Sequence, residues 1–129
     1  MDKRLRERHL IYNKFNGRCA YCGNHIEYKN MHVDHQTPVT RCYGSMLMPK
    51  RDNLENKMPS CRNCNNYKSS WELEEFRYYL DMMLNKTPEK NLFKSSTKMK
   101  VAISFGDLKL PKWDKQFYFE KLNYERLKK

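Results

Sequence analysis

The sequence lacks a long apolar run, and its cysteines cannot all pair. No stretch approaches the roughly 20 apolar residues that a membrane helix needs, and the N-terminus MDKRLRERH is charged where a signal peptide would be apolar. Five cysteines are an odd number, which excludes a complete disulfide framework. We therefore expect an intracellular protein in a reducing compartment.

Acidic residues are scarce: the chain has 15 Asp and Glu against 26 Lys and Arg, a formal net charge of +11. The excess is not uniform. Residues 1–18 carry six basic and two acidic side chains, residues 19–85 carry eight of each, and residues 86–129 carry twelve and five. This division suggests a basic N-terminal helix, a neutral core and a basic, aromatic-rich C-terminal extension. Cationic flanks of this kind suit an anionic partner such as nucleic acid, although a merely solvated surface has the same composition.

At 129 residues the chain has enough length for one domain with a small core, which a bound metal would help to stabilise. Residues 2–16 favour a helix that stops at Gly17. Near-alternation predicts a strand over residues 26–35, residues 36–55 lack a period and predict a long loop, and residues 57–60 predict a second strand. A helix beginning at residue 62 would complete a ββα unit, so the expected fold class is α+β.

Further along, Ser69 and Glu72 have the spacing of a capping box, and apolar residues at helical spacing predict a helix over about 71–85. Val101, Ile103 and Phe105 alternate as in a strand. Residues 116–127 fit either helix or strand. Their aromatic residues could stack on bases, but packing in the core is the better expectation.

Four of the cysteines form two CxxC pairs, each able to bring two thiolates to one side of a tight turn. Together they fit a closed, tetrahedral, structural zinc site, and the fifth cysteine, Cys42, would be a small buried or free thiol. The alternatives are two unrelated turns or a thioredoxin-like redox pair. The expected zinc ligands are Cys19, Cys22, Cys61 and Cys64.

The segment between the CxxC pairs holds the residues that hydrolysis would need. Asp34 offers a carboxylate oxygen and Asn65, where a helix opens, offers an amide oxygen, a pairing that suits Mg²⁺ or Mn²⁺ better than zinc. His35 offers an imidazole nitrogen that can take a proton from water. Asn53 could fix the loop and orient the imidazole. We expect His32, on the same strand face as Asp34, to be a surface residue.

The patterns CAYCG, VDHxxP, DNL and CRNCNxxK, in this order, resemble those of the HNH endonuclease family over roughly residues 17–80. The resemblance implies a ββα-metal fold with His35 as general base, Asp34 and Asn65 as ligands of a catalytic Mg²⁺ or Mn²⁺, and Asn53 as the residue that positions the base. It also implies four cysteine ligands for one zinc ion. The last family position, often histidine, is Asn65 here, an asparagine variant that also occurs in active members.

The resemblance further implies hydrolysis of DNA phosphodiester bonds. In the expected mechanism water attacks phosphorus and leaves 5′-phosphate and 3′-hydroxyl ends, and with a single metal a monomer would nick, whereas a double-strand break would need a homodimer or two visits. We expect the protein in the cytoplasm of a bacterium or of a phage-infected cell. RNA remains open as a substrate. A zinc-dependent DNA-binding module without catalysis is the first alternative, and a zinc deaminase or a thiol oxidoreductase fits less well. The expected DNA contacts are Arg41, Lys50, Arg51 and Lys68, each also compatible with an ordinary solvated side chain.

Overall fold

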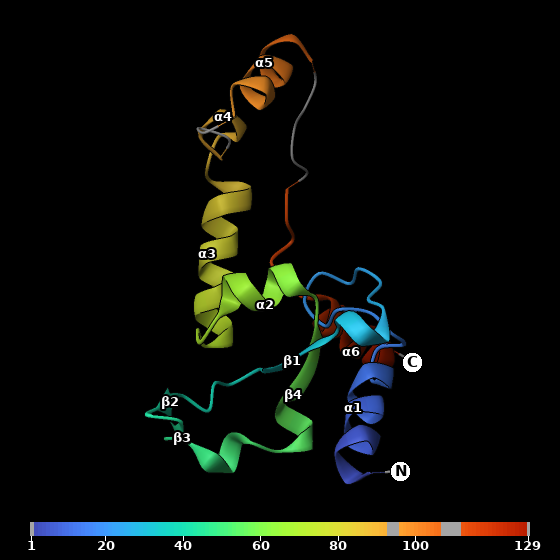
Figure 1. The fold of residues 1–129 in the computed structure, drawn as a ribbon. Helices are drawn as coiled ribbons and strands as arrows, with labels where there is room; N and C mark the ends of the chain where they lie inside the picture. Colours follow the sequence, from blue (N-terminus) through green and yellow to red (C-terminus); the bar gives the residue numbers. More distant parts are fainter. Residues whose placement is uncertain (1, 93–95, 107–111, 129) are drawn as a thin grey trace. The chain divides into compact units, whose positions relative to one another are not determined.

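The computed structural model describes residues 2–92, 96–106 and 112–128 (Figure 1). The chain divides into two compact units. Unit 1 comprises Met1–Leu73 and Gln116–Lys129, and unit 2 comprises Glu74–Lys115. Unit 1 is thus built from two separate parts of the chain, whereas the division expected from charge had boundaries after residues 18 and 85.

A two-stranded sheet and the helix that follows it form the centre of unit 1. Strand β1 (His32–His35) pairs antiparallel with β4 (Lys57–Ser60), with Asp34 opposite Met58. Helix α2 (Arg62–Lys68) contacts β1. The expected ββα unit and the α+β fold class are confirmed, but β1 is shorter than predicted because the 3₁₀ turn η1 (Tyr28–Asn30) occupies the first part of the expected strand.

Helix α1 (Lys3–Asn13) contacts β4, and Asp2 caps its N-terminus by accepting a hydrogen bond from the Arg4 amide at 3.1 Å. It ends earlier than predicted, at Asn13. Gly17 does adopt a positive φ of 78°, but it follows a further turn after the helix.

The long loop between β1 and β4 contains more regular structure than its sequence suggests. A small hairpin joins β2 (Arg41–Cys42) to β3 (Ser45–Met46), and the 3₁₀ turns η2 (Pro49–Arg51) and η3 (Leu54–Asn56) follow. Asn56 closes the loop onto the end of β1. Its Nδ2 donates to the carbonyls of Thr37 (2.8 Å) and Arg51 (2.7 Å), and its Oδ1 accepts from the Thr37 amide (2.9 Å).

The second part of unit 1 returns to the first CxxC turn. The amide of Tyr118, which begins helix α6 (Tyr118–Lys128), donates to the Tyr21 carbonyl at 3.0 Å, and the Phe119 amide donates to the Ala20 carbonyl at 2.9 Å. Phe117 and Phe119 are only 1% and 7% exposed, so these two aromatic residues pack in the core, as expected. Gly23 has a φ of 80°, and a Cβ there would lie 2.8 Å from the Tyr118 ring, so only glycine fits this turn.

Unit 2 is helical in the residues that the structure describes. Its helices are α3 (Leu73–Asn85), α4 (Glu89–Leu92) and α5 (Thr97–Phe105). The strand predicted from Val101, Ile103 and Phe105 is wrong. Those residues lie in α5, which Ser96 caps by accepting from the Met99 amide at 3.3 Å.

The start of α3 also differs from its prediction. The helix begins at Leu73, and Ser69 ends α2 with a φ of 49° instead of capping α3. Beyond α3, Asn85 fastens the returning chain: its Nδ2 donates to the Trp113 carbonyl at 2.9 Å, and its Oδ1 accepts from the Trp113 amide at 2.7 Å. No described helix combines the length and the apolar character that crossing a membrane requires.

Candidate active site and metal centre

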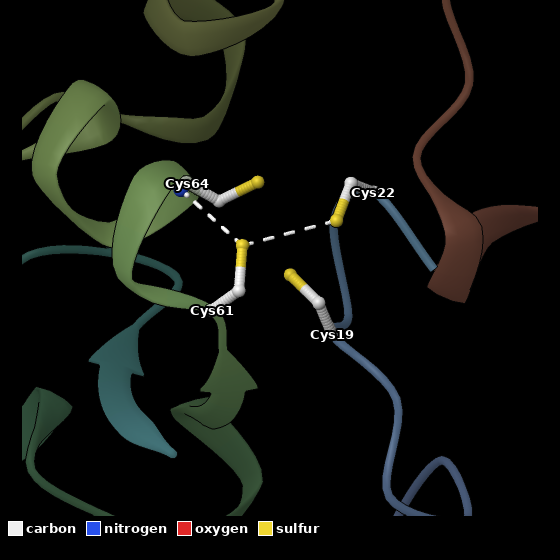
Figure 2. Close-up of side chains that lie close together, drawn as sticks. All are labelled: Cys19, Cys22, Cys61 and Cys64. Carbon is white, nitrogen blue, oxygen red and sulfur yellow. Dashed lines mark hydrogen bonds between the residues drawn. The ribbon is translucent and has the colours of Figure 1, made fainter. Parts of the chain in front are cut away.

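The four cysteines of the two CxxC motifs converge, as predicted. Figure 2 shows Cys19 and Cys22 on one loop and Cys61 and Cys64 at the start of α2, with their sulfur atoms directed toward one another. All four sulfurs lie within 4.8 Å of one another, and the Cys22 and Cys61 sulfurs are 3.9 Å apart. A tetrahedron with zinc–sulfur bonds of about 2.3 Å has edges of about 3.8 Å, so the cluster fits a zinc ion.

The thiols of this cluster influence one another strongly. Hydrogen bonding from Cys22, and then from Cys64, lowers the pKa of Cys19, and the same interaction with Cys19 raises the pKa of Cys64. The lowered pKa favours a thiolate at Cys19, while the raised pKa keeps Cys64 protonated. Several thiolates so close together would repel one another. A divalent cation removes that repulsion, which supports a metal centre.

Two of the alternative functions fit this geometry poorly. A redox pair needs only two cysteines, whereas four sulfurs converge here and all five cysteines are free. A zinc deaminase needs a histidine or a further cysteine in an open site together with a nearby glutamate, whereas the metal-ligand group found among the described residues consists of four cysteines. Cys42, outside the cluster, is an exposed free thiol.

Asp34 is the most constrained residue of the candidate active site. Its side chain is 8% exposed, and Oδ2 accepts a hydrogen bond from the Tyr21 hydroxyl. The Lys68 ammonium lies 3.0 Å from the same oxygen. Burial, and then the Asp34 charge, raise the pKa of Tyr21, so its hydroxyl keeps the proton that it donates. Among the described residues both of these contacts go to Oδ2 and not to Oδ1.

Asn65 lies on the helix that covers the Asp34 face of β1. Residues alternate along a strand, so His32 and Asp34 share a face. Asn65 Nδ2 lies 3.5 Å from His32 Nδ1, and Lys68 of the same helix contacts Asp34. Asn65 therefore lies beside the strand face that carries both His32 and Asp34. His32 is exposed, as expected, but it contacts a candidate ligand.

His35 ends β1, and its imidazole contacts an acidic residue of the loop. His35 Nε2 lies 2.8 Å from Asp52 Oδ1. Because a carboxylate only accepts hydrogen bonds, Nε2 carries the proton, and in the neutral ring Nδ1 is the basic nitrogen. Hydrogen bonding from His35, supported by Lys57 at 3.4 Å, lowers the pKa of Asp52. The ring is therefore held with one nitrogen available to accept a proton.

Among the described residues, the hydrogen bonds of the Asn53 side chain go to Lys50 and Asn56 and not to His35. Asn53 caps η3 by accepting from the Asn56 amide at 2.8 Å, and its Nδ2 donates to the Lys50 carbonyl at 3.0 Å. The partner of the ring is the neighbouring residue Asp52, which the sequence motifs did not single out. The DNL motif does contain this acidic residue. Because Asp52 and Asn53 are adjacent in the sequence, the motif alone does not tell which of the two faces the ring.

His35 borders two pockets. The first, of about 330 Å³, is lined by Asp34, His35, Arg41 and Ser69 among others. The second, of about 440 Å³, extends from His35 and Asp52 to Arg4 of α1. The first pocket brings the candidate cation ligand and the candidate base to one cavity, and the second links the base to a basic surface.

The four residues predicted to contact DNA differ in their exposure to solvent. Arg41 and Lys50 are exposed. Arg51 donates to the Pro38 carbonyl at 3.1 Å and pairs with Glu72 at 3.3 Å, so it braces the loop. The expectation for Lys68 is wrong: its side chain is fully buried, pairs with Asp34 and donates to the His35 carbonyl at 3.0 Å, which leaves no surface for a phosphate.

Residues 19–70 match the family model described as HNH endonuclease. The family resemblance expected from the motifs is confirmed for this segment. No curated protein matches the chain significantly. Among solved structures, the chain is similar to the Type II-C Cas9 enzyme from Actinomyces naeslundii, with 20% identity and a TM-score of 0.48 over 64% of this chain. It spans 8% of that protein's length.

Proposed function

We propose that the protein is a metal-dependent endonuclease that hydrolyses phosphodiester bonds in DNA. The observation that carries this proposal is the shared pocket of Asp34 and His35 within the HNH domain, with His35 held by Asp52 at 2.8 Å. A carboxylate beside a histidine serves hydrolysis of a phosphodiester when a cation intervenes, since a bare carboxylate would repel the substrate.

In the proposed reaction, Nδ1 of His35 takes a proton from a water molecule that attacks the phosphorus atom in line. Asp52 keeps Nε2 protonated and stabilises the imidazolium that forms. The bond between phosphorus and the 3′ oxygen breaks on the opposite side, and the departing oxygen takes a proton from solvent, which gives 5′-phosphate and 3′-hydroxyl ends.

Asp34 and Asn65 would hold the catalytic cation, and their oxygen atoms favour Mg²⁺ or Mn²⁺ over zinc. Such a cation, when bound, supplies the positive charge that stabilises the phosphorus centre and the departing oxygen. The four cysteines would hold a separate, structural zinc ion, because a site closed by four thiolates offers no position for substrate.

The exposed basic side chains next to His35 would contact DNA phosphates. Arg41 borders both pockets, Arg4 borders the second, and Lys50 lies in the same loop as Asp52. Each neutralises phosphate charge and fixes the position of the duplex without recognising a sequence. With one catalytic site per chain, a monomer would nick double-stranded DNA, and a double-strand break would require a homodimer or two successive cuts.

The test is cleavage of supercoiled plasmid in Mg²⁺, in Mn²⁺ and in chelator, with His35→Ala as the catalytic variant. His25→Ala is the matched control, because His25 is exposed and borders neither pocket at His35. We expect metal-dependent nicking by wild type and by His25→Ala, and none by His35→Ala. A wild type that binds zinc and plasmid but never cuts would favour the alternative, a non-catalytic zinc-dependent DNA-binding module.

A further inference from the structure

The Asp34 carboxylate is held from two sides by groups that the proposed reaction does not use. The Tyr21 hydroxyl donates to Oδ2, and the Lys68 ammonium lies 3.0 Å from the same atom. Tyr21 is 4% exposed and Lys68 is fully buried, so neither group is available to substrate. Their contacts fix the direction in which the other carboxylate oxygen points.

Both groups come from the elements that carry the cysteine ligands. Tyr21 lies between Cys19 and Cys22 in the first CxxC turn, and Lys68 ends the helix whose first turn holds Cys64. The two halves of the four-cysteine cluster therefore each place one group against Asp34. A change in the geometry of the cluster would be transmitted directly to this carboxylate.

The Tyr21 ring itself is held firmly. Phe117 and Phe119 contact it edge-on, with ring centroids at 5.5 and 6.2 Å, and the Tyr118 amide donates to the Tyr21 carbonyl. A ring fixed by aromatic neighbours and by its own backbone gives its hydroxyl a defined position, which a freely rotating side chain would not have.

We propose that Tyr21 is a positioning residue for the Asp34 carboxylate and thereby links the first CxxC turn to the catalytic cation site. This inference rests on the proposed function, because it assigns Asp34 as a cation ligand. The Tyr21 hydroxyl occupies Oδ2 and presents Oδ1 to the cation. Removal of such a partner of a metal ligand typically lowers metal affinity by about 10–100-fold.

The test is the Mn²⁺ affinity of zinc-loaded protein, measured by electron paramagnetic resonance for wild type, Asp34→Asn and Tyr21→Phe. Tyr21→Phe removes the hydroxyl and keeps the ring that packs on Phe117. The matched control is Tyr28→Phe, because the Tyr28 hydroxyl is buried and has no hydrogen-bond partner among the residues that the structure describes. Zinc content and the thermal unfolding midpoint are measured for every variant.

We expect Tyr21→Phe to bind Mn²⁺ at least about tenfold more weakly than wild type, with zinc content unchanged and Tyr28→Phe unaffected. Plasmid nicking by Tyr21→Phe should recover at saturating Mn²⁺, because the variant loses affinity for the cation and keeps the base. Equal Mn²⁺ affinity in Tyr21→Phe and wild type would overturn the inference. So would a loss of affinity that accompanies an equal loss of zinc, since Tyr21 would then only support the fold.

The two proposals fail in distinguishable ways. A wild type that nicks plasmid while Tyr21→Phe keeps full Mn²⁺ affinity removes the inference and leaves the nuclease. A wild type whose Mn²⁺ binding depends on both Asp34 and Tyr21 but which cuts no DNA supports the inference and removes the nuclease. A wild type that binds no Mn²⁺ overturns both.

Discussion

Asp52 Oδ1 lies 2.8 Å from Nε2 of His35, and the same oxygen is 3.4 Å from the Lys57 ammonium. The carboxylate thus connects the histidine that ends β1 to the residue opposite it on β4. Lys57 also pairs with Glu7 of α1 at 2.5 Å. The orientation of the imidazole therefore depends on a chain of charged groups that crosses three elements.

The first prediction concerns this contact. Asp52→Ala should lower the nicking rate by about tenfold or more, a part of the roughly 10²–10⁴-fold that a positioned general base contributes. Asp52→Asn keeps an oxygen acceptor and should be affected less. Glu55→Ala is the control, because Glu55 is an exposed acidic residue of the same loop. Single-turnover nicking measures the effect, and equal rates for Asp52→Ala and wild type would contradict it.

Removal of zinc should destabilise unit 1. Cys64→Ser should lower the unfolding midpoint by more than about 10 °C, because a loss of about 3 kcal/mol shifts a unit of this size by about 4–8 °C per kcal/mol. Cys42→Ser is the matched control, since Cys42 is exposed and lies outside the cluster. The measurement is thermal unfolding of both variants by circular dichroism, with zinc content determined in parallel.

Lys68→Met should cost about 3–5 kcal/mol of unfolding free energy, because it leaves the Asp34 charge buried without its partner. The double variant Lys68→Met with Asp34→Asn should recover part of that loss, since the unpaired charge is then removed. Lys50→Met, at an exposed lysine, should change the stability little. Denaturant unfolding gives the comparison. A small effect of Lys68→Met alone would contradict the role of this ion pair.

Phe117→Ala should destabilise unit 1 by about 3–5 kcal/mol, the usual cost of truncating a buried phenylalanine. Phe105→Ala is the control, because Phe105 is 90% exposed. If both variants unfold at the same denaturant concentration as wild type, Phe117 does not contribute to the core.

Arg41→Ala should weaken DNA binding at low salt and reduce the slope of log affinity against log salt by about one. The measurement uses the His35→Ala protein, so that no DNA is cut. Lys29→Ala is the control, because Lys29 is highly exposed but borders neither pocket at His35. A slope unchanged by Arg41→Ala would remove Arg41 from the phosphate contacts.

The sequence predicts the centre of the fold well because its signals there are local. Residues 57–60 form β4 over the predicted range, and the two CxxC motifs converge because their spacing and residue type leave few alternatives. Predictions are weaker where a few alternating apolar residues fit both a strand and a helix. Val101, Ile103 and Phe105 alternate as in a strand, yet the Ser96 cap accompanies a helix.

Contacts between distant residues explain the remaining differences. Asp52 and Asn53 are neighbours, and only the backbone path of the loop decides which one faces His35. Lys68 lies three residues after Asn65, in a motif from which we expected a DNA contact. Its position on helix α2 instead directs the side chain into the core, where it pairs with Asp34. The pairing of Phe119 with Ala20 joins residues about a hundred positions apart, which no local pattern reveals.

That last pairing bears on how the protein folds during synthesis. Domains generally fold as their chains emerge from the ribosome, N-terminal part first. Here the turn between Cys19 and Cys22 emerges before unit 2, but the residues that pack against Tyr21, Phe117 and Phe119, follow unit 2. All of unit 2 is translated in between. The core around the candidate nuclease site is therefore completed only after all of unit 2 has been translated.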